Sequence, residues 1–416
     1  MKLLKVDTIE QTKDKLANCF CGLPRKTEMI PLSGAVGRTL AEDIASDTDM
    51  PEFTRSVVDG YAVKASDTFG VGDTVPVFLK IIGEAKMGTA IETDISSGET
   101  VYVPTGGMLP AGADAMVMIE YTELLSKDTV AIYKSAAPGN GVMSRGEDFS
   151  AGKILLRDGD RISVKEIGLL ACLGKSQVKA YRKPKVALIS TGDELVEVDQ
   201  TPLPGQIRDI NSHVMDAFLE RLGAEVTMRA LAKDDFDALR AASVKALETN
   251  DIVLISGGSS QGNKDMTESV ITSLGAPGVF THGIAIKPGK PTILGAVEDG
   301  EKAKLVAGLP GHPMSAIVVY MAVIEPFIKQ YYLNSASAEL RVLARIAENI
   351  HAGEGRETWQ PVKINRLSSG ELAAVPIHAK SGSIHQLVYA DGFVRIPVMS
   401  EGIDSGDVVE VALIQS

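Results

Sequence analysis

The chain has 416 residues, a length that favours about two to four domains at roughly 150 residues each. Hydrophobic residues make up 44% and charged residues 23%, ordinary globular proportions that exclude a disordered protein, a coiled coil or a collagen-like fibre. The formal net charge of −12 argues against a protein that binds nucleic acid or an anionic membrane, because such binding needs a broad basic surface. Any anion site must therefore be local.

The cysteines and the apolar runs indicate the compartment. Cys19, Cys21 and Cys172 are too few for a disulfide framework, and no second cysteine pair completes a zinc site. The N-terminal residues lack the apolar core of a signal peptide, and the longest apolar run, 314–324, is too short to span a bilayer. We therefore expect a cytoplasmic protein with free thiols.

The N-terminal part of the chain predicts a helix followed by a β-rich insert. Asp7 or Thr8 can cap a helix whose residues Ile9, Leu16 and Phe20 have helical spacing. Turn-rich sequence then carries short β runs at 75–79, 101–103 and 115–119. Helical periodicity returns between 155 and 180, so we expect this stretch to pair with the N-terminal helix. Residues 1–46 and 147–181 are thus predicted to form a discontinuous helical domain, with 47–146 inserted in it.

The C-terminal half predicts an α/β domain and then a β domain. In 182–332, buried strand runs at 186–189, 225–227 and 252–255 alternate with helices at 212–222 and 236–247, which predicts a parallel doubly wound sheet. Loops at the carboxyl ends of such strands form the ligand crevice, here 191–194, 257–265 and 308–313. Residues 333–416 alternate apolar and polar side chains between turns, which predicts a C-terminal β barrel.

The loop 257–265 is the first candidate for binding chemistry. It follows a buried strand and precedes a helix-like run, so its glycines can present backbone N–H groups to an anion. It lacks the spacing of a Walker A loop or of a GxGxxG fingerprint. A glycine-rich turn without a ligand is the alternative.

Basic and acidic residues on other loops extend this candidate site. Lys287-Pro288-Gly289-Lys290-Pro291 holds two lysines on a stiff loop, a possible clamp for a phosphate or an oxyanion. Carboxylates beside glycines or on the predicted loops offer hard oxygen ligands that suit Mg²⁺: Asp59, Asp193, Glu194, Asp209 and Asp265. Solvated lysines and turn or cap carboxylates are the alternatives. The dispersed histidines argue against a zinc site, and no Gly-x-Ser-x-Gly motif supports an acyl-transfer triad.

Seven motifs occur in one order along the chain: 56–63, 104–106 with 111–115, 145–148, 190–195, 257–265, 287–291 and 308–311. In this order they resemble the MoeA family of molybdopterin molybdenumtransferases, which includes the E domain of gephyrin and of the plant enzyme Cnx. The resemblance covers nearly the whole chain.

The resemblance implies a multidomain α/β architecture with four parts. These are a helical linker domain (1–46 and 147–181), an inserted mostly-β domain (47–146), a doubly wound α/β catalytic domain similar to MogA and MoaB (182–332) and a C-terminal β barrel (333–416). It also implies a homodimer in which the insert of one subunit closes the crevice of the other. Its partners would be a MogA/MoaB-type protein that adenylates molybdopterin and the apo-molybdoenzymes that receive the cofactor.

The activity that the resemblance implies is the reaction of adenylated molybdopterin with molybdate, with Mg²⁺, to give molybdenum cofactor and AMP. Residues that look like the nucleotide and pterin-diphosphate site are Gly257, Gly258, Ser259, Asp193, Glu194, Asp209 and Asp265, of which Asp209 and Asp265 look like metal ligands. Residues that look like the oxyanion site are Lys287, Lys290, Arg356 and Ser383, with Pro310 and Pro313 shaping the neighbouring loop. Residues that look like groups supplied by the partner subunit are Asp59, Thr105, Glu147 and Asp148.

Two departures from the family pattern affect fine specificity. Many members read Gly-Gly-Val-Ser-Val-Gly at 257–262, where this chain reads Gly-Gly-Ser-Ser-Gln-Gly, and Asn in place of His312. The alternative functions are a molybdopterin adenylyltransferase, a tungstate-specific insertase and a non-catalytic scaffold.

Overall fold

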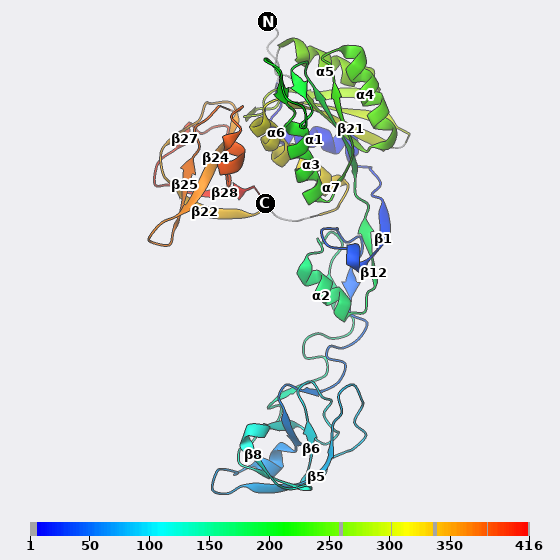
Figure 1. Ribbon diagram of the computed structural model, residues 1–416, viewed down its shortest axis with the longest axis vertical. Coiled ribbons are helices and arrows are strands. Elements are labelled where there is room, and N and C mark those ends of the chain that lie inside the picture. The colour runs from blue at the N-terminus through cyan, green and yellow to red at the C-terminus, as the bar shows by residue number, and fades with distance from the viewer. Residues whose placement is uncertain (1–5, 258–260, 301, 336–338, 381, 415–416) are drawn as a thin grey trace. The chain divides into compact units, whose positions relative to one another are not determined.

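A computed structural model describes residues 6–257, 261–300, 302–335, 339–380 and 382–414, without the side chains of 261–265 and 302 (Figure 1). The chain divides into two compact units. The insert unit comprises residues 43–157, and the main unit comprises 1–42 and 158–416.

The centre of the main unit is a six-stranded sheet in the order β16-β13-β17-β21-β20-β18. Its strands are β13 (Lys185–Thr191), β16 (Glu225–Ala232), β17 (Ile252–Gly257), β18 (Pro277–His282), β20 (Ile293–Asp299) and β21 (Lys302–Pro310). The first four strands in the sheet order are parallel, as predicted, whereas β20 and β18 run antiparallel to their neighbours. The predicted strands at 186–189, 225–227 and 252–255 are thus parallel, and β20 and β18, which were not predicted, add an antiparallel edge.

Helices cover both faces of this sheet (Figure 1). They are α3 (Asn211–Leu222), α4 (Phe236–Thr249), α5 (Gln261–Ser273), α6 (Pro313–Val319), the π-helical turn η4 (Tyr320–Ile324) and α7 (Glu325–Tyr331). Successive strand residues face opposite sides: Val186 and Leu188 pack with α3, α6 and α7, while Ala187 and Ile189 pack with α4 and α5. Gly223 closes α3 at a φ of 96°, a left-handed conformation that suits glycine. The doubly wound architecture is confirmed.

The N-terminal helix α1 (Ile9–Phe20) belongs to this core. Thr8, one of the two predicted caps, caps it in a capping box with Gln11. Leu16 and Phe20 are buried in the apolar cluster that holds α3, α6 and α7, and the rings of Phe20 and Phe327 lie 4.8 Å apart. The expected pairing of α1 with the helix of 155–180 was wrong, because the apolar face of α1 is covered by the α/β domain.

The two linker segments meet through strands instead. Strand β1 (Thr27–Pro31) pairs antiparallel with β12 (Gln177–Tyr181), beside η1 (Leu32–Gly34) and α2 (Val164–Cys172). The prediction of helical structure between 155 and 180 was therefore correct for residues 164–172 only.

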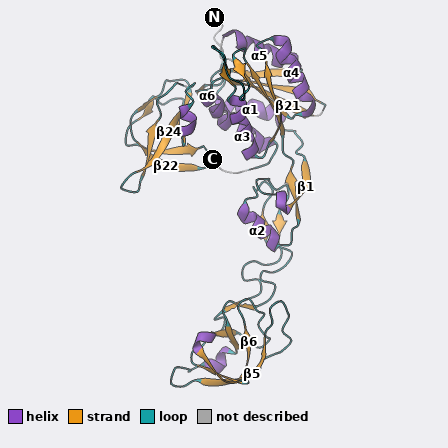
Figure 2. Cartoon of the chain, viewed as in Figure 1, coloured by secondary structure: helices purple, strands orange, loops and turns teal. Residues whose placement is uncertain are grey.

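The C-terminal part of the main unit forms a barrel (Figure 2). Its strands are β22 (Arg341–Ile346), β24 (Glu357–Arg366), β25 (Leu372–Pro376), β26 (Gly392–Ile396) and β28 (Val408–Leu413). The order β24-β25-β22-β28-β26 is closed by a further pairing of β24 with β26, which confirms the predicted barrel. The helix α8 (His385–Tyr389) and the pair β23 (Ile350–His351) and β27 (Gly402–Ile403) accompany it.

The insert unit is built on a six-stranded sheet in the order β7-β4-β6-β5-β9-β8. Its elements are β2 (Ile44–Ala45), β3 (Arg55–Ser56), β4 (Gly60–Val63), η2 (Ala65–Thr68), β5 (Val77–Glu84), β6 (Glu99–Val103), β7 (Ala115–Met118), η3 (Ile119–Tyr121), β8 (Thr122–Ser126), β9 (Thr129–Ile132), β10 (Val142–Met143) and β11 (Ile154–Leu156). Apolar clusters lie on both faces of the sheet. No helix in the described part of the whole chain has the length and apolarity needed to cross a bilayer.

Candidate active site

Three of the predicted loops leave the main sheet at one edge. Thr191 at the end of β13 is in register with Gly257 at the end of β17, and Gly257 is in register with Pro310 at the end of β21. The three strands are parallel, so the loops after them begin side by side. The expected convergence is confirmed from the backbone pairing.

Close packing explains the first glycine of the 257–265 loop. A Cβ atom at Gly257 would lie 2.5 Å from Cγ2 of Thr191, so a larger residue would push β13 and β17 apart. Gly258, Ser259 and the side chain of Asp265 lie outside the described residues.

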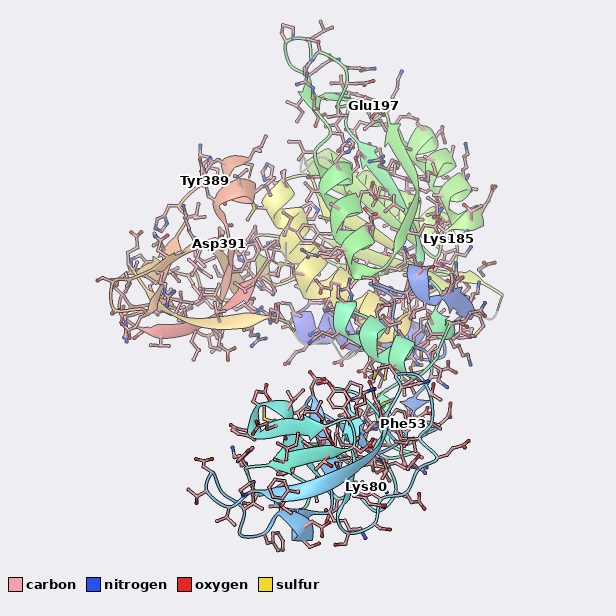
Figure 3. The ribbon with its side chains drawn as sticks, turned by 60° about the horizontal axis from the view of Figure 1, so that its bottom comes forward. Phe53, Lys80, Lys185, Glu197, Tyr389 and Asp391 are labelled. Atoms are coloured by element: carbon pink, nitrogen blue, oxygen red, sulfur yellow. The ribbon has the colours of Figure 1, made fainter. Side chains whose placement is uncertain are left out.

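Asp209 is the buried carboxylate at this edge, with 6% of its surface exposed. It follows β15 (Ile207–Arg208), which pairs with β14 (Leu195–Val196) in an excursion beyond the end of β13. Figure 3 labels Glu197 on this excursion and Lys185 at the start of β13. The hydroxyl of Ser190 donates to Oδ2 of Asp209 (2.8 Å), and the backbone N–H of Ser212 approaches Oδ1 (3.3 Å). The carboxylate thus joins the end of β13 to the start of α3.

Asn211, which the sequence reasoning missed, joins the other two strand ends. Its Nδ2 donates to Oγ of Ser256 (2.7 Å) and to the carbonyl of Gly311 (2.8 Å). Its Oδ1 is buried and has no hydrogen-bond partner among the described residues. The sequence offered one indication of this role, because Asn211 stands two residues after Asp209 at the start of a helix.

Asp193 and Glu194 are exposed on the loop after β13, where Asp193 Oδ1 approaches the backbone N–H of Asp234 (3.3 Å). Carboxylate oxygens at this edge are the donor type that Mg²⁺ prefers. Among the described side chains, no group of three acidic, histidine or cysteine residues is close enough to hold a metal by itself. The donors therefore fit a cation that keeps water ligands or takes oxygens from a bound phosphate.

Lys287 lies where the α/β domain meets the barrel. It belongs to β19 (Ile286–Lys287), which pairs with β24 so that Lys287 is in register with Thr358 and Ile286 with Glu357. Arg356 directly precedes this paired stretch of β24. Lys287 is exposed, and no ion pair of its ammonium group is seen within the described parts of the chain.

The rest of the Lys-Pro-Gly-Lys loop packs against α6. A Cβ atom at Gly289 would lie 2.8 Å from Cγ2 of Val319, and φ of Gly289 is 123°, so this position requires glycine. Lys290 is exposed, and its carbonyl accepts a hydrogen bond from the N–H of Ile284 (3.0 Å).

The loop after β21 connects the acidic edge with the basic region. Pro310 is in register with Gly257, while Pro313 is the first residue of α6. A Cβ atom at Gly382, beside Ser383, would lie 3.6 Å from Cδ2 of His312. Gly257 and the loop of Ser383 thus both lie beside the 308–313 loop.

Of the insert-unit candidates, Asp59 and Thr105 are in contact. Oδ1 of Asp59 accepts a hydrogen bond from the backbone N–H of Thr105 (2.8 Å). The backbone N–H of Ser56 donates to the carbonyl of Gly107 (2.9 Å). A Cβ atom at Gly60 would lie 2.0 Å from the carbonyl oxygen of Val117, so only glycine fits beside Asp59. Glu147 and Asp148 are exposed on the segment between β10 and β11.

These features define a multidomain α/β protein with a candidate ligand site at the carboxyl edge of its doubly wound sheet. The chain matches three family models, described as "MoeA N-terminal region (domain I and II)" over residues 6–174, "Probable molybdopterin binding domain" over 187–330 and "MoeA C-terminal region (domain IV)" over 343–414.

Known proteins resemble the chain over most of its length. A Haemophilus influenzae protein named molybdopterin molybdenumtransferase is 35% identical over 77% of this chain and 76% of its own length. A Bacillus subtilis protein of the same name is 31% identical over 94% and 90%. The crystal structure of a molybdopterin biosynthesis MoeA protein from Pyrococcus horikoshii matches 98% of this chain and 100% of that chain, with 29% identity and a TM-score of 0.83. The chain belongs to the MoeA family.

Proposed function

We propose that this protein is a molybdopterin molybdenumtransferase, which inserts molybdate into adenylated molybdopterin and releases AMP to form molybdenum cofactor. The observation that carries the proposal is the 308–313 loop, because it starts beside Gly257 at the strand edge and its His312 lies near Gly382, next to Ser383. Family membership and the names of the relatives support the same reaction.

The proposed roles follow from the charge of the groups. The reaction breaks the phosphoanhydride bond between AMP and the phosphate of molybdopterin. An oxygen nucleophile forms a new P–O bond to the phosphorus that it attacks, and the bridging oxygen leaves with the other phosphate. Lys287, Lys290 and Arg356 would hold the molybdate dianion with Ser383, because fixed cations stabilise an oxyanion. Asn211 and Asp209 would keep the three strand-edge loops, including the one that begins at Gly257, in place around the diphosphate.

Mg²⁺ is part of the proposal. Asp209 and Asp265 would hold it, with water and phosphate oxygens as the remaining ligands. When bound, the cation supplies positive charge to the diphosphate.

The proposed assembly is a cytoplasmic homodimer. Asp59, Thr105 and Asp148 of one subunit would complete the pocket of the other. A MogA/MoaB-type protein would supply adenylated molybdopterin, and apo-molybdoenzymes would receive the product.

The test is AMP release by the purified protein with adenylated molybdopterin, molybdate and Mg²⁺. We expect Lys287→Ala to abolish most of the molybdate-dependent AMP release, while Lys127→Ala, at an exposed turn of the insert unit, keeps the wild-type rate. Absence of AMP release, together with no cofactor able to activate an apo-enzyme, would contradict the proposal. ATP consumption with pyrophosphate release would identify an adenylyltransferase instead.

A further inference from the structure

The chain segment that carries Lys287 is held through its backbone from two sides. On one side, the N–H of Ala285 donates to the carbonyl of Asp7 (2.7 Å), and the N–H of Asp7 donates to the carbonyl of Gly283 (3.0 Å). On the other side, the carbonyl of Ala285 accepts a hydrogen bond from the N–H of Glu357 (2.9 Å), the first residue of β24. The segment is thus the middle one of three, and Asp7 lies in an outer one.

The same segment closes the base of the loop that holds both lysines. The N–H of Ile284 donates to the carbonyl of Lys290 (3.0 Å), and the N–H of Gly283 donates to the carbonyl of Thr292 (2.8 Å). Ile284 is fully buried, and its backbone bridges that of Asp7. A displacement of Asp7 would therefore move the base of the loop, and both ammonium groups with it.

The carboxylate of Asp7 in turn fixes the outer segment. Its Oδ2 accepts hydrogen bonds from Nζ of Lys15 on α1 (2.6 Å) and from Oγ1 of Thr281 on β18 (2.9 Å). Nζ of Lys15 also donates to the carbonyl of Phe280 (2.8 Å). Asp7 and Thr281 are both buried, so loss of the carboxylate would leave a buried hydroxyl without its partner. Hydrogen bonds to an ionised group are strong, and these join the segment of Asp7 to one helix and one strand.

We propose that Asp7 is a positioning residue for the oxyanion site, because it fixes the backbone on which the loop of Lys287 and Lys290 is built. Asp7 acts through this loop and needs no contact with the oxyanion itself. It keeps the two ammonium groups where one tetrahedral dianion can meet both, and a small misplacement of such groups is costly. The inference rests on the proposed function, and it adds a residue that lies outside the seven sequence motifs.

The charge of Asp7 distinguishes positioning from simple electrostatics. A carboxylate repels a dianion, so electrostatics alone predicts that Asp7→Ala strengthens molybdate binding. Positioning predicts the opposite, because the loop loses its support. Thr281→Val removes the hydroxyl without changing charge or shape, so it should weaken molybdate binding through geometry alone.

The first experiment measures KM for each substrate in the AMP assay. We expect Asp7→Ala to raise KM for molybdate about threefold to tenfold, a part of the roughly hundredfold loss that a displacement of about 1 Å can cause. KM for adenylated molybdopterin should stay within about twofold, whereas a smaller folded fraction would lower the rate and leave both KM values unchanged. Thr281→Val should raise KM for molybdate as well, and Thr281→Ser should keep the wild-type value.

The matched control for the kinetic experiment is Asp14→Ala, which removes an exposed carboxylate from α1 and should keep both wild-type KM values. An unchanged or lowered KM for molybdate in Asp7→Ala and Thr281→Val would overturn the inference. An equal rise in both KM values would overturn it too, because the effect would then not belong to the oxyanion site.

The second experiment needs no turnover. Equilibrium dialysis of the full-length protein measures molybdate binding, and hydrogen–deuterium exchange measures the protection of the Ala285 amide. We expect Asp7→Ala to weaken molybdate binding about threefold to tenfold and to speed exchange in the peptide that contains Ala285. Asp14→Ala should match the wild type in both measurements.

The outcomes separate this inference from the proposed function. Equal molybdate affinity in wild type and Asp7→Ala would overturn the inference even where AMP release by the wild type supports the proposed function. Molybdate binding that depends on Asp7, in a protein that releases no AMP, would contradict the proposed function alone. A wild type that neither binds molybdate nor releases AMP would contradict both.

Discussion

Asn211 connects two strand ends with one amide group. Its Nδ2 contacts the carbonyl of Gly311, which can only accept, so the orientation of the amide is fixed. The second contact, to Ser256, brings in the end of β17. Because the contact with Ser256 is buried and that with Gly311 is partly buried, their loss would leave polar groups without partners.

We expect Asn211→Ala to lower the free energy of unfolding of the main unit by about 1–3 kcal/mol, the cost of leaving buried polar groups unpaired. The AMP release rate should fall as well, because the loops after β17 and β21 lose their connection. Urea denaturation and the AMP assay measure the two effects. Asn140→Ala, at an exposed residue of the insert unit, is the control. Wild-type stability and rate in Asn211→Ala would show that the amide has no such role.

Asp49 gives the insert unit a pH-dependent contact. The backbone N–H of Ala151 donates to Oδ1 (3.0 Å), Arg145 Nε donates to Oδ2 (2.9 Å), and these contacts hold the pKa of the Asp49 carboxyl below its usual range. A carboxylate with a lowered folded-state pKa stabilises the fold above its unfolded pKa. That stabilisation is lost as the pH falls through the folded value.

We expect Asp49→Asn to be less stable than wild type near neutral pH and to match it once the pH is below the lowered pKa. Urea midpoints of the insert unit, followed from about pH 7 to about pH 2, test this. Asp73→Asn, at an exposed turn, should show no such convergence. A difference for Asp49→Asn that stays constant over the whole pH range would contradict the assignment.

At the scale of elements, α1 shows that a helix near the chain terminus can be part of a distant core. The ring of Phe20 packs edge to face on Phe327, and Leu16 lies in the same cluster as residues of β13 and β17. The helix therefore covers part of the sheet face that α3 and α6 leave open.

We expect Phe20→Ala to destabilise the α/β domain by about 3–5 kcal/mol, the usual cost of removing a buried aromatic ring. Lys13→Ala, on the exposed face of α1, should change the unfolding free energy by less than about 0.5 kcal/mol. Urea unfolding followed by far-UV circular dichroism compares the two variants. Equal stability of Phe20→Ala and wild type would mean that α1 does not support the α/β core.

The elements that could be predicted from sequence are those that local patterns specify. Alternating buried strands and amphipathic helices specified β13, α3 and α4, and the parallel strands then placed three loops at one edge. Helical periodicity identified α1 but not its partner, since an apolar face fits several surfaces. The antiparallel β18 and β20 were missed because short apolar runs do not reveal strand direction.

The site was only partly predictable for the same reason. Asp209 and Lys287 stand in recognisable motifs. The position of Thr358 beside Lys287, in contrast, depends on a strand pairing between residues 71 apart in the chain. Asn211 has no local signal beyond its position after Asp209. Long-range register and side-chain contacts are properties of the folded molecule.

At the scale of the whole molecule, the chain enters and leaves the insert unit close to one place. Strand β2 near the start of the insert pairs with β11 near its end, so the unit has both of its connections next to each other. An insert of this kind keeps its own apolar cores. In the proposed dimer it would contribute residues to the site of the other subunit.

We expect two inactive variants, Asp59→Asn and Lys287→Ala, to restore activity when they are unfolded and refolded together. About half of the dimers would be mixed, and each would hold one intact site, which gives roughly a quarter of the wild-type AMP release. Each variant refolded alone is the control, and sedimentation measures the dimer content. Failure of restoration with normal dimer content would mean that Asp59 and Lys287 act in the same subunit.

The pairing of β19 with β24 limits how this protein can be divided. Glu357 and Thr358 supply the backbone partners of the strand that carries Lys287, and the N–H of Glu357 donates to the carbonyl of Ala285 (2.9 Å). A chain truncated before the barrel would keep every residue of the α/β domain and still expose an unpaired strand edge at its basic loop. The barrel is therefore no exchangeable module: a chimera that swaps it must carry a matching β24, or the lysine loses its support and the new edge promotes aggregation.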